Sequence, residues 1–472
     1  MNWHDKSILV LGAGDTGVSI VRWAIGMGAR VRIADTRHDP PGLAQLRANY
    51  PACDIVTGAF SAALFGDAEL IVASPGVAIA GPACDAAIAR ARAEGKKFVG
   101  DVELFAWEQI ELAKQGRRAK MIAITGSNGK STVTAMAGAM CRAAGLKTVI
   151  AGNIGLPVLD AAIAARAAHD GGQPDVYVVE LSSFQLETTE SLDCDSAAML
   201  NLSQDHLDRY ASMGDYANAK QRIFLHAKHQ VLNREDAASF SMRDKNLPGA
   251  TFGIDAAEND NDFGIADGWL MQGRTRLLPL SDMPVAGLHN AANALAAFAL
   301  CRAIGADAQA LADGLRNFTG LPHRVENVGV INGVTYYDDS KGTNVGATVA
   351  ALNGMTVPVV LIAGGVGKEQ DFSPLAEPIR KRARAVVLIG KDARSIESAI
   401  TSARVETIHA VSMADAVAAA HAASKPGDAV LLSPACSSFD MFRNYNHRGD
   451  VFAECARSLM ARVEGGDAID VI

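Results

Sequence analysis

The sequence has no apolar run long enough to cross a membrane, no C-x-x-C pair and no excess of positive charge. Its seven cysteines are scattered, which favours reduced thiols in a cytosolic protein over a disulfide framework or a zinc site. A net charge of −8 argues against a general nucleic-acid-binding protein. The first residues run directly into an apolar segment, so we expect no signal peptide and a cytoplasmic protein without a membrane partner.

The 472 residues suffice for about three domains, each with its own core. Apolar segments alternate with helical ones, which predicts an α/β fold. Strands are expected at 7–11, 30–34, 70–73, near 98, and at 121–124, 148–151, 176–180, 197–201, 334–337, 358–363, 385–389, 406–410 and 429–433. An irregular, β-containing region is expected at 233–282 and a long Ala-rich helix at 288–304. The expected domains are 1–116, 117–320 and 321–472, with a linker at 114–120 before the second.

Two glycines frame a short loop between an apolar segment and a helix-compatible run, in Ala123-Ile-Thr-Gly-Ser-Asn-Gly-Lys-Ser-Thr132. Such glycines let the backbone curl so that its N–H groups converge on phosphate oxygens. The lysine can reach the terminal phosphates, and the following serine can ligate Mg²⁺. The loop is two residues shorter than the general pattern, which marks it as a family-specific variant. The predicted ATP or GTP site comprises Gly126, Ser127, Asn128, Gly129, Lys130, Ser131 and Thr132.

A second glycine pattern, Gly12-x-Gly14-x-x-Gly17, follows the first apolar segment. With Asp35 at the end of the next strand, it is typical of NAD binding. A helix N-terminus at this point can equally hold the pyrophosphate of a UDP-sugar. Because the ATP loop is the stronger motif, we favour an anionic substrate here and keep a dehydrogenase as the rival.

Side chains near later strand ends are candidate catalytic groups. Glu180 ends an apolar strand beside the ATP loop, where ATPases hold Mg²⁺. His206 follows another strand, and its sequence context fits a metal ligand and a partly buried histidine equally well. Lys220 lies in a run typical of a helix surface, which by itself predicts a solvated lysine. Asn290 and Asn293 stand at a helix start, where asparagine caps the helix or contacts adenine.

Six segments spread over the chain together resemble one family. They are Thr125-Gly-Ser-Asn-Gly-Lys-Ser-Thr132, Gly152-Asn-Ile-Gly155, Glu180-Leu-Ser-Ser-Phe-Gln-Leu-Glu187, Asp205-His-Leu-Asp208, Gly287-x-His-Asn-x-x-Asn293 and Pro322-His-Arg324. This set resembles the Mur ligase family, which joins amino acids to UDP-N-acetylmuramic acid in peptidoglycan synthesis. Four further segments are most similar to the members that add D-glutamate to UDP-N-acetylmuramoyl-L-alanine: Asp35-Thr-Arg37, Ser74-Pro-Gly76, Asp339-Ser-Lys-Gly-Thr-Asn344 and Ser433-Pro-Ala-Cys-Ser-Ser438.

The resemblance implies a fold and a set of cofactors. The first domain would be Rossmann-like and bind the UDP substrate, and the second would be of the P-loop ATPase type. The third would be Rossmann-like, close over the site and bring the amino acid. ATP and two Mg²⁺ ions are expected, in a monomer whose partners are the two small substrates. Catalysis would proceed through an acyl phosphate.

The resemblance also implies roles for single residues. The UDP substrate would meet Thr16, Asp35, Arg37, Gly76, Asn153 and His206. Lys130 would contact the β- and γ-phosphates, Ser131 and Glu180 would hold one Mg²⁺, and His206 with a carbamylated Lys220 would position a second. Adenosine or phosphates would meet Asn290, Asn293, Arg324 and Asp339, and D-glutamate would meet Lys341, Thr343, Lys368, Ser438 and Tyr445.

Three positions depart mildly from the family pattern. Gly342 and Gln204 stand where Ala and Glu are expected, and Tyr445 stands in place of Phe. The alternatives are another amino-acid-adding Mur ligase, a folylpolyglutamate-type ligase, a Rossmann dehydrogenase, and a non-catalytic nucleotide-binding module.

Overall fold

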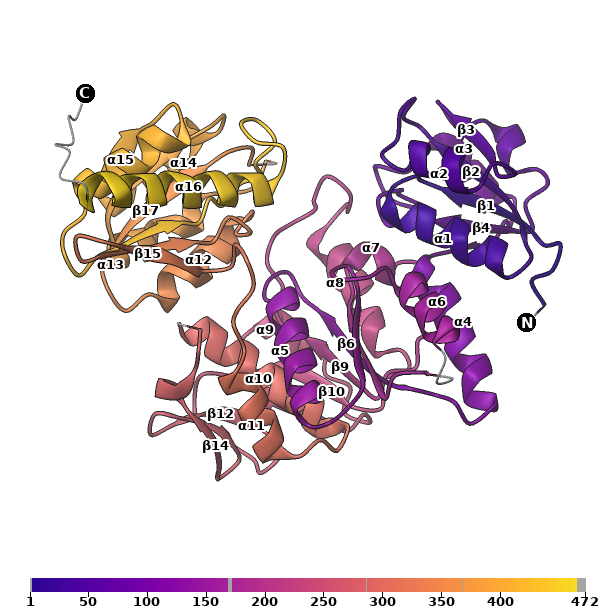
Figure 1. Cartoon of the computed structure of the whole chain (residues 1–472), viewed down its shortest axis with the longest axis horizontal. Coiled ribbons are helices and arrows are strands. Elements are labelled where there is room, and N and C mark those ends of the chain that lie inside the picture. The colour runs from indigo at the N-terminus through magenta and orange to yellow at the C-terminus, as the bar shows by residue number, and fades with distance from the viewer. Residues whose placement is uncertain (1, 169–171, 286, 368, 465–472) are drawn as a thin grey trace. The chain divides into compact units, whose positions relative to one another are not determined.

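The computed structural model of the protein describes residues 2–168, 172–285, 287–367 and 369–464 (Figure 1). The chain forms two compact units: Met1–Leu202 with His206–Leu278 and Ala294–Leu315, and Ser203–Asp205 with Pro279–Asn293 and Arg316–Ile472. Three sheets of five, nine and six strands confirm the α/β fold predicted from the alternation. The domain boundaries after 116 and 320 stay predictions. Within the described ranges, no helix has the length and hydropathy needed to span a bilayer.

The five-stranded sheet has the parallel order β3-β2-β1-β4-β5. Its strands are β1 (Ser7–Leu11), β2 (Arg30–Asp35), β3 (Asp54–Thr57), β4 (Leu70–Ala73) and β5 (Phe98–Val99), and its helices are α1 (Asp15–Gly26), α2 (Leu43–Asn49), η1 (Ala62–Phe65), α3 (Ala86–Ala93) and α4 (Asp101–Lys114). Ile8 and Val10 pack with α1 and α4, whereas Leu9 and Leu11 pack with η1 and α3, because successive strand side chains face opposite ways. The strand order reverses between β1 and β4, where ligands bind at the carboxyl ends of such sheets.

The nine-stranded sheet has the order β14-β13-β12-β11-β10-β9-β6-β8-β7. Its strands are β6 (Lys120–Thr125), β7 (Thr148–Gly152), β8 (Val176–Glu180), β9 (Ser196–Met199), β10 (Gln230–Asn233), β11 (Gly249–Phe252), β12 (Phe263–Ala266), β13 (Trp269–Gln272) and β14 (Thr275–Pro279). Its helices and the segments that follow it are α5 (Lys130–Ala143), α6 (Val158–Ala167), α7 (Ser183–Leu186), α8 (Met213–Gln221), η2 (Arg222–Phe224), α9 (Ala237–Ser241), η3 (Leu280–Asp282), α10 (Leu288–Ala303) and α11 (Ala308–Arg316). The region 233–282, expected to be irregular with some β structure, contributes the short strands β11 to β14. Strand β6 lies between β8 and β9, so three strand ends meet around the predicted phosphate loop.

The six-stranded sheet has the order β15-β16-β20-β17-β18-β19, parallel except for β15. Its strands are β15 (Glu326–Ile331), β16 (Val334–Asp338), β17 (Val359–Gly364), β18 (Ala383–Ile389), β19 (Glu406–His409) and β20 (Ala429–Leu432). Its helices are α12 (Val345–Gly354), η4 (Ser373–Leu375), α13 (Ala376–Arg382), α14 (Ala393–Ile400), η5 (Thr401–Ala403), α15 (Met413–Ala423) and α16 (Tyr445–Glu464). The neighbouring strands β16 and β20 both end in loops predicted to bind ligands.

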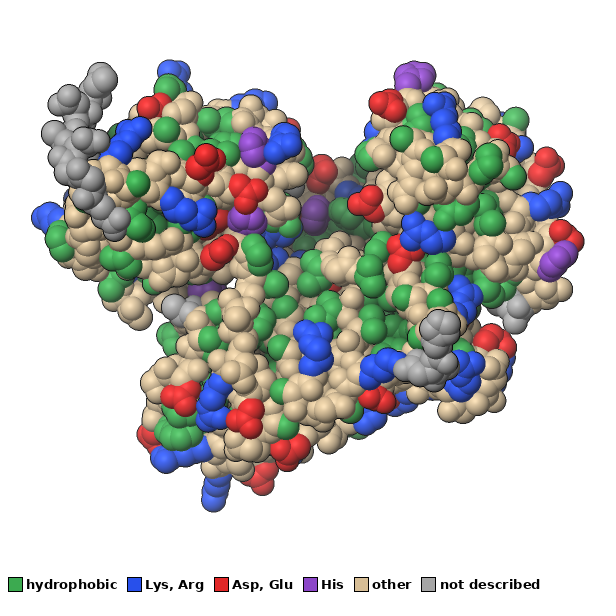
Figure 2. Space-filling view, in the orientation of Figure 1, with side chains coloured by type: hydrophobic (Ala, Val, Ile, Leu, Met, Phe, Trp, Pro, Cys, Tyr) green, Lys and Arg blue, Asp and Glu red, His purple; other side chains and the backbone are tan. Residues whose placement is uncertain are grey.

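Charged side chains of both signs are interspersed on the face in view (Figure 2). Basic side chains on this face do not gather into one broad surface, which agrees with the net charge of −8.

Candidate functional site

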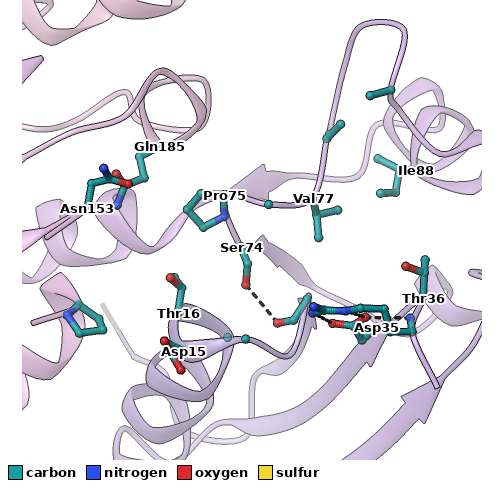
Figure 3. Close-up of a pocket in the computed structure, with 18 of the residues that line it drawn as sticks. Asp15, Thr16, Asp35, Thr36, Ser74, Pro75, Val77, Ile88, Asn153 and Gln185 are labelled. Carbon is teal, nitrogen blue, oxygen red and sulfur yellow. Dashed lines mark hydrogen bonds and ion pairs between the residues drawn. The ribbon is translucent and has the colours of Figure 1, made fainter. Parts of the chain in front are cut away.

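A cavity of about 740 Å³ lies at the carboxyl ends of β1 and β4 (Figure 3). Five of the six residues predicted to meet the UDP substrate line it, namely Thr16, Asp35, Arg37, Gly76 and Asn153, whereas His206 is not among its lining residues. The first four belong to the part of the chain that forms the five-stranded sheet, and Asn153 directly follows β7. The volume suits a small-molecule site, for which about 300–1,000 Å³ is usual. Residues distant in sequence thus share one pocket, and their contacts with substrate stay predictions.

The glycine pattern at this cavity brings helix α1 close to the end of β1. A Cβ atom built on Gly17 would lie 1.9 Å from the carbonyl oxygen of Gly12, whose φ is +91°. The first turn of α1 lines the cavity. Its N-cap residue is Gly14, which has no side chain to accept a hydrogen bond from the first N–H groups of the helix. Backbone N–H groups at such a helix start suit an anion such as a pyrophosphate.

Asp35 is held by protein donors on both carboxylate oxygens. One oxygen accepts from the Ala13 N–H at 2.7 Å and from Arg37 Nη2 at 2.7 Å, and the other accepts from the backbone N–H and Nε of Arg37, each at 2.9 Å. Burial by itself raises the pKa of Asp35, but these hydrogen bonds outweigh it and lower the pKa to about 2. A carboxylate engaged in this way is poorly placed to hold the ribose hydroxyls of NAD. The contacts instead orient Arg37 at the cavity wall.

The Asp35 carboxylate is expected to stabilise the fold in a pH-dependent way. Because its pKa is lowered in the folded protein, its contribution is present above the ordinary value of 3.8 and is lost as the pH falls through about 2. We expect Asp35→Asn to lower Tm at neutral pH, and the difference from the parent protein to shrink in melts below about pH 4. Asp54→Asn, on an exposed carboxylate paired with Arg32, is the control. A Tm difference that does not change with pH would contradict this assignment.

The predicted phosphate loop connects β6 to α5, the strand-to-helix position that the motif requires. Gly126 and Gly129 have φ angles of +156° and +82°, which the curled backbone needs. Lys130 folds back over the loop, and its Nζ donates to the carbonyl oxygens of Gly126 and Ser127, both at 2.9 Å. The side-chain amide of Asn201 accepts from the Asn128 N–H at 2.8 Å and donates to the Asn128 carbonyl at 3.1 Å. Asn201 was not among the predicted site residues, although it lies two positions after the end of β9.

Glu180 lies at the end of β8, beside the loop, and is 1% exposed. Its Oε1 accepts from Asn153 Nδ2 at 2.7 Å, whereas Oε2 is buried without a hydrogen-bond partner in the described chain. A buried carboxylate oxygen that no donor satisfies is costly unless a cation binds it. Ser131, in the first turn of α5, is also buried. These groups fit a Mg²⁺ site, and the ligand set stays a prediction.

Lys220 is buried at 1% exposure, so the interpretation of this helix face as a solvated surface is wrong. Its Nζ donates to the carbonyl oxygen of Gly126 at 2.8 Å and lies 4.7 Å from the ring centroid of Tyr216. Packing of α8 against the phosphate loop, which the local sequence does not reveal, buries the side chain. Lys220 and Lys130 therefore converge on the same carbonyl oxygen. Tyr216, which was not predicted, has its hydroxyl 3.2 Å from Ser127 Oγ.

His206 is half-buried and has a φ of +57°. Its ring meets that of Phe184 edge-to-face, with centroids 4.7 Å apart. Phe184 belongs to the short helix α7, which follows Glu180 closely. The aromatic contact thus fixes the imidazole near the Glu180 segment, and its ligand role stays a prediction.

The second unit contains the residues predicted to contact adenosine and phosphates. Asn293 Nδ2 donates to Asn290 Oδ1 at 3.4 Å near the start of α10. Asp339, which follows β16, accepts from Ser433 Oγ at 2.7 Å. Burial raises the pKa of Asp339 to about 7, and the positive charge of Arg324 opposes this shift. Arg324 and Asp339, distant in sequence, are therefore neighbours.

The loops after β16 and β20 contain three of the residues predicted to bind D-glutamate, Lys341, Thr343 and Ser438, and Tyr445 is the first residue of α16. Lys341 Nζ lies 3.7 Å from the ring centroid of Tyr445, which provides a cation–π contact. The Thr343 N–H donates to the Lys341 carbonyl at 2.8 Å, and Ser438 is buried. Lys368 lies outside the described residues. The pocket roles of all five stay predictions.

A buried arginine that the sequence did not point to joins these two loops. Arg448, on α16, is 1% exposed, and its Nε and Nη2 donate to Ser340 Oγ and the Ser340 carbonyl at 2.9 and 2.8 Å. Its Nη1 donates to the Cys436 carbonyl at 3.1 Å. Burial lowers its pKa to about 10. The guanidinium of Arg448 therefore connects the loop after β16 with the loop after β20.

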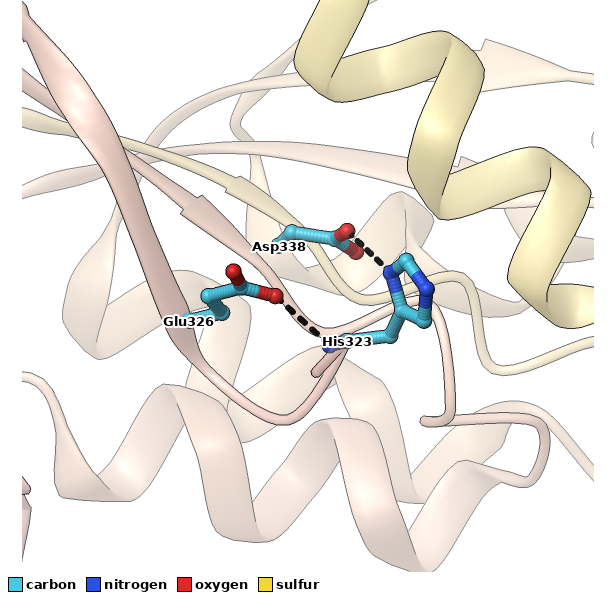
Figure 4. Close-up of side chains that lie close together, drawn as sticks. All are labelled: His323, Glu326 and Asp338. Carbon is cyan, nitrogen blue, oxygen red and sulfur yellow. Dashed lines mark hydrogen bonds and ion pairs between the residues drawn. The ribbon is translucent and has the colours of Figure 1, made fainter. Parts of the chain in front are cut away.

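The Arg324 segment is held by a histidine and two acids (Figure 4). His323 Nδ1 lies 2.7 Å from Asp338 Oδ2, and the His323 N–H donates to Glu326 Oε2 at 2.9 Å. The hydrogen bond with Asp338 raises the pKa of His323. Ligand-type atoms of the three residues lie within 4.8 Å of one another, but these hydrogen bonds already account for the grouping. His323 and Val325, with φ of +60° and +51°, flank Arg324, so the cluster stabilises a constrained turn.

Three family models match the chain. The N-terminal domain of MurD-like Mur ligases matches residues 6–100, the Mur ligase middle domain matches 124–301, and the Mur ligase glutamate ligase domain matches 323–436. Together they reach all three sheets, although β6 is matched only from residue 124 onward.

Curated relatives match over their whole length. The UDP-N-acetylmuramoylalanine--D-glutamate ligase of Methylobacillus flagellatus is 53% identical, over 97% of this chain and 98% of that protein. The ligase of the same name from Nitrosospira multiformis is 49% identical, over 100% and 99%. Among solved structures, the UDP-N-acetylmuramate-alanine ligase MurC of Thermotoga maritima has a TM-score of 0.58 at 19% identity, covering 97% of this chain and 100% of that chain. MurF of Acinetobacter baumannii has a TM-score of 0.58 at 16% identity, with coverages of 97% and 92%, so these two likenesses concern the fold alone.

Proposed function

The chain belongs to the Mur ligase family, and on this premise we propose that it joins D-glutamate to UDP-N-acetylmuramoyl-L-alanine at the expense of ATP. The reaction adds an amino acid to a peptidoglycan precursor. We place it in the cytoplasm, in a monomer that binds ATP with two Mg²⁺ ions and two small-molecule substrates.

One geometric observation carries the proposal within the first unit. Asn153 lines the 740 Å³ cavity, and its side chain also donates to Glu180 beside the phosphate loop. A long substrate whose uridine end lies near Arg37 would therefore present its other end next to the loop that holds ATP. A dehydrogenase needs no second phosphate site at this place.

The proposed chemistry follows from the low reactivity of a carboxylate. The γ-phosphate of ATP is transferred to the alanyl carboxylate of the UDP substrate, which gives an acyl phosphate and ADP. The amine of D-glutamate then attacks the acyl carbon and loses a proton, and the tetrahedral intermediate expels phosphate to leave an amide. The enzyme lowers the barrier of each step by positioning the reacting groups and by placing opposite charge where charge develops in the transition state.

The residues of the chain contribute position and charge. Lys130 offsets the repulsion between the γ-phosphate and the attacking carboxylate. Ser131, Glu180, His206 and a carbamylated Lys220 are the proposed metal ligands, and bound Mg²⁺ supplies positive charge to the phosphate oxygens. Closure of the C-terminal domain would keep water away from the acyl phosphate.

D-glutamate is expected to be the amino acid that drives rapid phosphate release in a panel with UDP-N-acetylmuramoyl-L-alanine and ATP. The reason is that cationic Lys341 and Lys368, with the hydroxyls of Thr343 and Ser438, suit a substrate with two carboxylates. The measurement is phosphate release with D-glutamate, L-glutamate, L-alanine and diaminopimelate. Turnover with L-alanine or diaminopimelate and none with D-glutamate would assign the chain to another branch of the family.

The remaining alternatives give different results in the same experiments. A dehydrogenase would be protected against thermal unfolding by NADH and not by ATP. A nucleotide-binding module would release no phosphate with any amino acid.

A further inference from the structure

The loop that follows β4 forms one wall of the substrate cavity, and an arginine far along the chain holds it. Residues Ser74 to Ala78 all line the cavity. Arg209 Nη1 donates to the Pro75 carbonyl at 2.8 Å, and Nη2 reaches the Val77 carbonyl at 3.4 Å. The carbonyls on both sides of Gly76 are therefore directed to one guanidinium group. Gly76 lies between Pro75 and Val77, which Figure 3 labels at the cavity.

The guanidinium of Arg209 is itself held in place. Its side chain is 8% exposed, and Nη2 donates to Glu187 Oε2 at 2.9 Å. The hydroxyl of Tyr210 donates to the other carboxylate oxygen of Glu187. The guanidinium carbon lies 4.2 Å from the ring centroid of Phe184, and the ring of Phe184 also contacts that of His206. A series of contacts thus runs from the cavity wall to His206.

We propose that Arg209 is a positioning residue for the UDP substrate: it keeps the loop 74–78 in the conformation that forms the cavity wall. The proposal rests on the proposed function, because it takes the occupant of the cavity to be the UDP substrate. Arg209 lines no part of that cavity, so it acts through the loop.

The geometry requires arginine at this position. A guanidinium presents several N–H groups in a rigid plane and can serve two carbonyls and a carboxylate together while stacking on an aromatic ring. An ammonium group is a point charge that keeps the ion pair with Glu187 but cannot span both carbonyls. The variant Arg209→Lys therefore keeps the positive charge opposite Glu187 but loses the hydrogen bonds that position the loop.

The test is the kinetics of Arg209→Lys with UDP-N-acetylmuramoyl-L-alanine, ATP and D-glutamate varied in turn. We expect KM for the UDP substrate to rise about tenfold and KM for ATP to stay within about twofold. Loss of folded protein alone would lower apparent kcat and leave every KM unchanged, so the split between substrates identifies positioning. An unchanged KM for the UDP substrate would overturn the proposal.

Arg234→Lys is the matched control. Arg234 is 11% exposed, donates to the Phe263 and Asp255 carbonyls and pairs with the Asp255 carboxylate, but touches nothing at the cavity. Its replacement should leave all KM values as in the parent protein. If Arg209→Lys does not fold, Glu187→Gln weakens the anchor of Arg209 instead, and we expect a smaller rise in the same KM; no rise would count against the proposal.

Calorimetric titration with the UDP substrate, without ATP, distinguishes failure of this inference from failure of the proposed function. A parent protein that binds the UDP substrate but releases no phosphate would refute the function alone. A Kd about tenfold weaker in Arg209→Lys would still support positioning. Equal Kd values in the two proteins would refute positioning whatever the activity.

Discussion

Replacing Lys130 by alanine is expected to lower kcat for phosphate release by about 10²–10⁴, the loss that follows removal of one transition-state electrostatic contact. Lys130 Nζ lies at the phosphate loop, bound to the Gly126 and Ser127 carbonyls. Its removal leaves the γ-phosphate facing the substrate carboxylate with less positive charge. The measurement is phosphate release at saturating ATP, with circular dichroism to confirm folding.

Lys114→Ala is the control for this loss of charge. Lys114 is 65% exposed and pairs only with Glu111 among the ion pairs of the described chain, so its removal should leave kcat unchanged. If Lys130→Ala kept its activity to within a factor of about ten, or 1.4 kcal/mol, the loop would not be the ATP site.

Lys220→Ala is expected to be nearly inactive yet folded. Lys130 and Lys220 both donate to the Gly126 carbonyl, and two ammonium groups sharing one oxygen repel each other. Carbamylation of Lys220 by CO₂ would remove one positive charge and provide an anionic oxygen that suits Mg²⁺. The alanine variant lacks this oxygen, so both activity and the dependence of activity on Mg²⁺ should change. Thermal melts show whether the fold persists.

Short carboxylates test the carbamate directly. Formate or acetate is expected to restore part of the activity of Lys220→Ala by occupying the place of the carbamate. Acetamide, which is similar in size and uncharged, should not, and Lys130→Ala should not respond to either acid. Activity of Lys220→Ala close to that of the parent protein, without added carboxylate, would show that the lysine takes no part in catalysis.

The sequence did not predict the short strands β3, β10 and β15, of which β3 and β15 are edge strands and β10 lies between β9 and β11. Strand β3 has four residues and begins with Asp54, and β15 contains Asn327 and Gly329. These residues are disfavoured in strands, and each strand pairs on one side only. Pairing with a stronger neighbour, β2 or β16, supplies the hydrogen bonds that local propensity does not. The central strands β1, β6, β8 and β17 are apolar over most of their length because both faces are covered, and they were predicted within a residue or two.

The phosphate loop was predictable because its function depends on neighbours in sequence. The glycines, the lysine and the serine act within one strand-to-helix turn, so their spacing alone specifies the geometry. The burial of Lys220 was not predictable in this way. Its helix α8 is polar on average and has no marked apolar face, and the partner atom on Gly126 lies 94 positions earlier.

The sequence by itself determined the alternation of strands and helices, the phosphate loop and the acid at the end of β8, because each depends on short-range spacing and backbone freedom. Only the tertiary structure decided that Asp35 accepts a hydrogen bond from the Ala13 N–H, that Lys220 is buried at the loop, and that Arg209 holds the Pro75 carbonyl 134 positions away. These contacts join segments that lie far apart in the sequence. Which groups meet depends on how the apolar faces of the helices and sheets are buried and on how buried polar groups find hydrogen-bond partners across the whole fold. No local pattern of residues predicts these pairings.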